Sequence, residues 1–121
     1  MIAEARTALS SLLEGAGFRV FEYVPPNITP PMAVMFPTSE WIAPGENYGE
    51  YRIGFNVRIF AQALTNENAT AAIDEYVESL LEYVDAAPGF YMAGLTAPEM
   101  YTENASTFLG VEAIVYQITR Q

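Results

Sequence analysis

The feature that most constrains this chain is a long segment in which apolar and polar side chains alternate. From Tyr51 to Ala63 every odd position is apolar, whereas the even positions are polar or small except for Phe60. This period of two predicts a β-strand with one buried face, because successive side chains of a strand point to opposite sides of the sheet. At 13 residues the segment exceeds the usual strand length of about 5–6 residues. We therefore expect part of it to extend beyond the sheet or to pair with a neighbouring subunit.

Two segments with apolar residues at helical spacing predict helices. Ile2–Leu13 has one apolar face and is followed by two nearby glycines, which favour a helix end. Ala69–Val84 carries the second apolar stripe. Thr65 and Asn66 precede it as candidate cap residues, and Pro88-Gly89 follows it as a stop. We expect each helix to bury its apolar stripe against the sheet.

Other segments have the aromatic and β-branched composition of strands. Phe18–Val24 and Phe108–Thr119 belong to this class, as does Met32–Phe36. Met32–Phe36 is apolar at every position, which indicates a strand buried on both faces. From Phe90 to Thr107 the signal is weaker: Phe90–Leu95 has strand character, Pro98 interrupts the pattern, and Thr102–Thr107 is polar. We expect this segment to form a variable loop or hairpin.

A long connection, Thr38–Glu50, precedes the alternating strand and is rich in turn-forming residues. It is roughly twice as long as the usual connection of about 4–6 residues, and long ordered loops frequently carry binding residues. Trp41 and Tyr48 lie in it, and Tyr51 follows. These three aromatic residues offer a stacking platform for nucleic-acid bases. Because such a platform needs positive charge nearby, we favour a packed loop or a subunit contact.

The predicted elements follow the order α-β-β-β-α-(β)-β within one domain, residues 1–121. Helices at both ends of a run of strands favour the α+β class. We expect a mixed or antiparallel sheet of about four to five strands, with two helices packed on one side of it.

Composition excludes several classes of function. Five basic and fifteen acidic residues give a net charge of −10, which disfavours nucleic-acid binding through a basic patch. The chain has no histidine and no cysteine, so it cannot build an imidazole or thiolate metal site or a histidine-activated nucleophile. No phosphate-binding or nucleophile-elbow motif is present. We predict a protein that is not an enzyme, binds no metal or cofactor, and does not contact a membrane.

The second predicted helix carries a run of acidic residues without any base. Asp74, Glu78 and Glu82 follow one another at spacings of four, and Glu75 lies beside them. Like charges at this spacing repel by about 0.2–0.5 kcal/mol per pair. One interpretation is that this stripe meets a basic partner surface or lines a channel that must not retain DNA. The other is that it is simply a solvated face of an acidic protein.

Taken in order, five features of the sequence match one known family along nearly the whole chain. They are Gly15–Val20 after the first helix, Pro30–Pro37, the long strand Tyr51–Ala63, the alanine-rich helix Ala69–Val84, and a closing strand ending in Val115–Thr119. In the order and spacing of these features the chain resembles the tail-terminator family of long-tailed bacteriophages. None of the features is a diagnostic motif by itself.

The resemblance implies a virion subunit of the tail-neck region, assembled in the host cytoplasm. Such subunits form a ring, expected to be hexameric, that caps the tail tube, stops its polymerisation and provides a surface for head joining. The implied partners are further copies of the chain, the tail-tube protein and connector or neck proteins, and DNA passes the lumen without specific binding. For this ring we expect Arg52 and Arg58 to pair with the acidic helix of the next subunit.

Two alternatives remain open at the level of sequence. The chain is also compatible with a head-tail connector or neck protein, because such proteins share much of the same pattern. A small acidic binding or regulatory module, which presents its carboxylates to a basic partner, is the alternative from a different class. The oligomeric state separates this second alternative from the ring.

Overall fold

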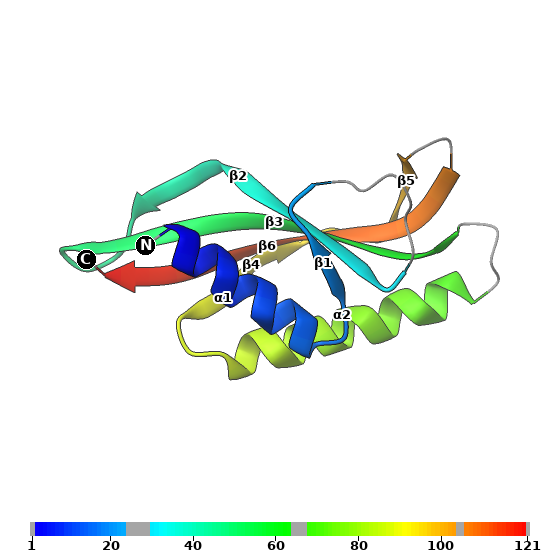
Figure 1. The fold of residues 1–121 in the computed structure, drawn as a ribbon, viewed down its shortest axis with the longest axis horizontal. Helices are drawn as coiled ribbons and strands as arrows, with labels where there is room; N and C mark the ends of the chain where they lie inside the picture. The colour runs from blue at the N-terminus through cyan, green and yellow to red at the C-terminus, as the bar shows by residue number, and fades with distance from the viewer. Residues whose placement is uncertain (1, 24–29, 64–67, 104–105, 121) are drawn as a thin grey trace.

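The structure, a computed structural model, describes residues 2–23, 30–63, 68–103 and 106–120. The described chain folds into two helices and one six-stranded sheet (Figure 1). The α+β class predicted from the sequence is confirmed. In chain order the elements are α1 (Ile2–Gly15), β1 (Arg19–Phe21), β2 (Met32–Pro44), β3 (Glu50–Ala63), α2 (Ala69–Ala86), β4 (Phe90–Leu95), β5 (Glu99–Glu103) and β6 (Ser106–Arg120).

The sheet is mixed, with the strand order β1-β2-β3-β6-β4. Only β1 and β2 run parallel, and every other described pair is antiparallel. The strands β4 and β5 follow one another along the same side of β6. The prediction of four to five strands falls short of the six observed, because β5 forms a hairpin with β6 in the segment that the sequence assigned to a loop or hairpin.

The connection predicted over Thr38–Glu50 is largely wrong. β2 continues through it to Pro44, so that only residues 45–49 join β2 to β3. Pro37 pairs with Phe55 on one side only, because β1 covers β2 no further than Val34. A proline is tolerated in such an edge position, where its missing N–H removes no ladder hydrogen bond. The register of β2 against β3 shifts between Pro37 and Ile42, and the pairing of the two strands resumes at Ile42.

Other predicted boundaries differ by a few residues. The strand expected over Phe18–Val24 is observed as Arg19–Phe21, and Val24 lies outside the described residues. α2 begins after Asn68, whose carbonyl accepts the N–H of Ala72. The candidate cap residues Thr65 and Asn66 also lie outside the described residues. No helix in the part of the chain that the structure describes is long and apolar enough to cross a membrane.

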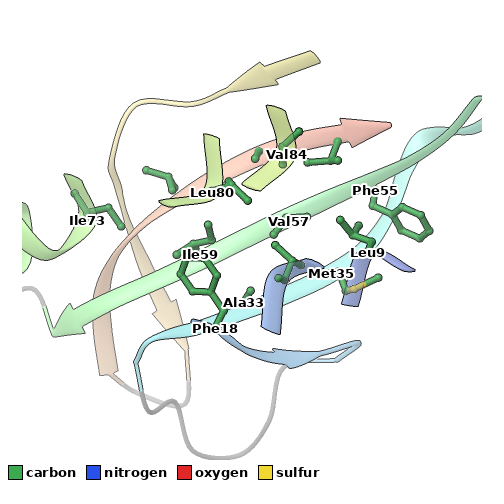
Figure 2. Packing of buried hydrophobic residues seen from close by; sticks show 14 of the residues in the cluster. Leu9, Phe18, Ala33, Met35, Phe55, Val57, Ile59, Ile73, Leu80 and Val84 are labelled. Atoms are coloured by element: carbon green, nitrogen blue, oxygen red, sulfur yellow. The ribbon is translucent and has the colours of Figure 1, made fainter. Parts of the chain in front are cut away.

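The main core lies between one face of the sheet and both helices. Leu9 and Leu13 of α1 and Leu80 of α2 are fully buried there against strand residues such as Val57 (Figure 2). Burying a side chain of this size stabilises the fold by about 1.5–3 kcal/mol. The other core residues of this layer are Ala5, Phe18, Ala33, Met35, Ile53, Phe55, Ile59, Ala61, Ile73, Val84, Val111, Ala113 and Val115.

A second, smaller cluster lies on the opposite face of the sheet. Met32, Val34, Phe60 and Phe108 are buried in it. The interpretation of Met32–Phe36 as a strand buried on both faces is confirmed, because its even residues join this cluster while Ala33 and Met35 join the main core. Aromatic rings rather than a helix cover this end of the second face.

Candidate subunit interface

One face of the sheet carries no helix among the described residues, and we call it the helix-free face. Alternate residues of β3 and β6 form its central part. The register joins them in pairs: Arg52 with Ile118, Gly54 with Tyr116, Asn56 with Ile114, and Arg58 with Glu112. Apart from the glycine, each of these residues is half-buried in the single chain. The face therefore combines apolar and aromatic side chains with arginine, asparagine and glutamate side chains.

The ring of Tyr116 packs against Gly54 on this face. A Cβ added to Gly54 would lie 2.5 Å from the Tyr116 ring, so the glycine provides the space that the ring fills. The Arg52 guanidinium stacks on the same ring at 4.8 Å from its centroid. Tyr91 of β4 stacks beside it, with ring centroids 5.4 Å apart, and accepts a hydrogen bond from Arg52 Nη1 at 3.5 Å. The four residues form one layered unit.

A second unit of the same kind lies further along the face. A Cβ on Gly110 would lie 2.9 Å from the ring of Tyr101, and the Arg58 guanidinium stacks on that ring at 4.5 Å. Arg58 also donates through Nε and Nη2 to a Glu112 carboxylate oxygen, at 3.2 and 2.9 Å. Phe36 supplies a further ring, 5.4 Å from the guanidinium. Arg58 is therefore held within its own chain.

The surroundings of Tyr101 change its ionisation. Burial raises the pKa of the Tyr101 phenol above its ordinary value, and the nearby Arg58 guanidinium opposes this shift in part. The carboxylates of Glu112 and Glu99 act in the same direction as burial, whereas a hydrogen bond with Thr96 acts against it. The neutral phenol is therefore the form that the helix-free face favours.

The acidic residues predicted on the second helix form a continuous exposed stripe. Asp74, Glu75, Glu78 and Glu82 are all exposed, and at 3.6 residues per turn they fall within an arc of about 100°. Leu80 and the other buried residues of α2 point in the opposite direction, toward the core. We call this stripe the acidic arc. It lies on the helix-covered side of the sheet, away from Arg52 and Arg58.

The three aromatic residues predicted as a platform or contact do not form a ring-to-ring cluster in the described chain. Trp41 lies on β2 rather than in a loop and packs against the main core. Its indole N–H is buried and has no hydrogen-bond acceptor among the described residues. Tyr51 is half-buried on β3, whereas Tyr48 is fully exposed in the turn between β2 and β3.

The turn that carries Tyr48 is held by a buried carboxylate. Glu50 is only 9% exposed, and its side chain accepts hydrogen bonds from the Glu46 N–H at 3.2 Å and from Asn47 Nδ2 at 3.3 Å. Gly49 adopts a φ of +78°, a conformation that favours glycine. Tyr48 is thus presented to solvent on an ordered turn, which lowers the entropy that a contact through it would cost.

Sequence reasoning missed the apolar row on β6. Ile114, Tyr116 and Ile118 point away from the helices and remain half-buried. The signal was present, because Ala113–Tyr116 is apolar at every position, the pattern of a strand that is covered on both faces. Among the described residues, helices lie over only one of these two faces.

No group of three or more acidic residues within the described ranges could hold a metal ion. Comparison with models of known protein families and with curated protein sequences finds no match to this chain.

Proposed function

We propose that this chain is the subunit of a closed ring that caps the tail tube of a long-tailed bacteriophage, stops its polymerisation and provides a surface for head joining. The helix-free face is the observation that carries the proposal. There the row Ile114, Tyr116 and Ile118 is half-buried with no helix over it in the described chain. Apolar and aromatic side chains beside arginine are the composition typical of subunit interfaces.

Opposite sides of the subunit differ in charge. The acidic arc lies on the α2 side, whereas Arg52 and Arg58 lie on the helix-free face. A contact between the helix-free face of one copy and the α2 side of the next joins unlike surfaces. Such a head-to-tail contact forms a ring when its rotation closes. Unlike charges also favour this pairing over a contact between two identical faces.

The net charge of −10 fits the central opening of such a ring. The carboxylates of the acidic arc that take no part in the contact line this opening. There they repel the phosphates of passing DNA. The partners are then further copies, the tail-tube protein, and connector or neck proteins. The subunit acts in the tail-neck region of the virion by shape and contact, without catalysis or a cofactor.

A second candidate function follows from the acidic arc itself. Its exposed carboxylates also suit a monomeric module that binds a basic partner. The mass of the purified protein in solution separates the two functions. Light scattering at low and high protein concentration and at two salt concentrations is expected to give a discrete closed oligomer. A monomer under all of these conditions contradicts the ring and favours the acidic module.

A matched pair of variants tests the face that carries the proposal. Tyr91 on the helix-free face is 36% exposed and Tyr83 on α2 is 42% exposed, so replacing either by serine removes a similar ring. Tyr91→Ser is expected to reduce assembly, because it removes the ring stacked on Tyr116. Tyr83→Ser controls for the general loss of an exposed tyrosine, because Tyr83 lies on the side of α2 that faces Gly15 of α1 and belongs neither to the acidic arc nor to the groove beside it. Equal effects of both variants on the oligomer mass contradict the assignment of the interface.

A further inference from the structure

Alternating side chains form a ridge on the edge strand β1 and the residues just after it, with exposed Arg19 and Tyr23 on either side of the half-buried Phe21. Arg19 stacks over the Phe21 ring at 5.7 Å, and Phe21 meets Tyr23 edge-on with ring centroids 6.1 Å apart. Tyr23 is 65% exposed and Arg19 is also exposed. Arginine and tyrosine are the types enriched at the centres of interfaces. We call these three residues the β1 ridge.

A groove of about 540 Å³ lies at the other edge of the sheet, between α2 and the segment that joins β4 to β5. Ile73, Val77 and Leu95 line its apolar part. Asp74 and Glu78 of the acidic arc line it as well, and both are exposed. We call it the α2 groove. Its chemistry suits an occupant that combines an apolar ring with a positive charge.

We propose that the β1 ridge of one copy binds in the α2 groove of the next copy. Arg19 supplies the charge that Asp74 and Glu78 require, and the rings of Phe21 and Tyr23 supply the apolar surface. The strands β1 and β4 are the two ends of the sheet order, so the contact joins opposite edges and is head-to-tail. This inference rests on the proposed ring and names the residues that close it.

Arg19 is a better candidate for this role than Arg58. The Arg58 guanidinium already bonds to Glu112 and lies against two rings of its own chain. Arg19 makes a ring contact within the described residues but no ion pair there. Binding to an acidic groove therefore adds a charge interaction to Arg19 without breaking an existing one. The contact also gives Asp74 and Glu78 of the acidic arc an oppositely charged partner.

The test uses two charge reversals and their mixture. Arg19→Glu and Glu78→Arg are each expected to raise the protein concentration needed for half-maximal assembly by about tenfold or more, because each places like charges in the contact. Mixing the two variants in equal amounts is expected to restore assembly. In the mixture, the introduced carboxylate meets the introduced guanidinium at one contact and the native pair meets at the next, which suits a ring with an even number of subunits.

Glu82→Arg is the matched control. It makes the same change of charge on the same exposed arc, but Glu82 does not line the α2 groove. This variant is expected to assemble at the native concentration. Circular dichroism and unfolding midpoints verify that all variants remain folded.

The outcomes separate this inference from the proposed function. An oligomer that Arg19→Glu and Glu78→Arg leave intact overturns the ridge-groove contact and leaves the ring standing. The same holds if Glu82→Arg weakens assembly as much as Glu78→Arg does, or if the mixture fails to recover. A native chain that stays monomeric at every concentration overturns both the ring and this contact.

Discussion

The two faces of the sheet are built in different ways. On the helix-covered face, Leu9, Leu13 and Leu80 fill the layer beneath α1 and α2, and each is fully buried. On the helix-free face, tyrosine rings pack against glycines, and arginines stack on the rings. The layer beneath the helices is complete within one chain. The helix-free face is half-buried and chemically mixed.

Stability of the single chain and association between chains therefore depend on different parts of the molecule. Close-packed aliphatic side chains beneath the helices stabilise the single chain, because their apolar surface is removed from water. Flat aromatic and arginine layers leave polar atoms and ring faces available to a second surface. Substitutions in the layer beneath the helices should therefore act on folding, and substitutions on the helix-free face should act more strongly on assembly.

The largest expected effect on folding lies in the helix-covered layer. Leu80→Ala is expected to lower the free energy of unfolding by about 2–5 kcal/mol, because it leaves a cavity between α2 and the sheet. Ile114→Ala on the helix-free face removes a half-buried side chain and is expected to cost less than half as much. Denaturant unfolding at a low protein concentration measures both. Equal losses would break the contrast between the faces.

The glycines beneath the tyrosine rings are the next test. Gly110→Ala is expected to cost about 1–3 kcal/mol, because its Cβ would lie 2.7 Å from the backbone oxygen of Ile59, which cannot move aside easily. Gly94 lies on β4 with nothing within 4 Å of an added Cβ. Gly94→Ala is therefore the control and is expected to leave stability unchanged or slightly higher. Thermal or denaturant unfolding of both variants decides the comparison.

Gly54→Ala tests the other glycine that packs against a tyrosine ring. An added Cβ at Gly54 meets the Tyr116 ring and the Thr38 hydroxyl, at 2.5 and 2.6 Å. A ring can be displaced more easily than a backbone, so we expect a smaller loss of stability than for Gly110→Ala. We also expect weaker assembly, because Tyr116 is lifted from the surface. A variant that assembles normally while losing stability would remove this glycine from the interface.

The Arg58–Glu112 pair is expected to contribute less to stability. Each side chain is 24% exposed, and hydrogen bonds to charged groups contribute about 1.5–3 kcal/mol when they are well shielded. Glu112→Gln is expected to cost about 1 kcal/mol, because solvent screens part of this interaction. A double-mutant cycle with Arg58→Met isolates the coupling from the general effect of each change. A coupling energy near zero would show that the stacked rings alone hold the guanidinium.

Much of the fold could be predicted from the sequence because its signals are periodic. The alternation in Tyr51–Ala63 and the apolar stripe of Ala69–Val84 each specify an element and its buried face. The extension of β2 beyond Pro37 could not be predicted in this way. A proline ends a central strand but not an edge strand, and the sequence does not state which strand lies at an edge.

The candidate interface was predictable only in part. The acidic arc follows directly from helical spacing, and all four predicted acids are exposed. The pairing of Gly54 with Tyr116 joins residues that are far apart in the chain, so no local pattern reveals it. The same applies to Arg58, whose partner Glu112 becomes a neighbour only through the register of β3 and β6. Register is a property of the whole sheet, and local periodicity does not determine it.

The smallest expected effect concerns the ionisation of Tyr101 on the helix-free face. Burial raises the pKa of its phenol in the folded chain above the ordinary value found in the unfolded chain. The folded chain therefore holds this proton more tightly than the unfolded chain does. As the pH rises above the ordinary pKa, the unfolded chain ionises first, so the free energy of unfolding declines until the pH passes the raised pKa. Tyr101→Phe cannot ionise, so its stability is expected to decline less over this alkaline window. At neutral pH the two proteins should differ only by the hydrogen bond with Thr96.

Denaturant unfolding at neutral and alkaline pH measures the difference in stability between the two proteins. Tyr48→Phe, which alters a fully exposed tyrosine, is the control. An alkaline decline that is the same in all three proteins would mean that the Tyr101 phenol is as solvated in the folded chain as Tyr48 is.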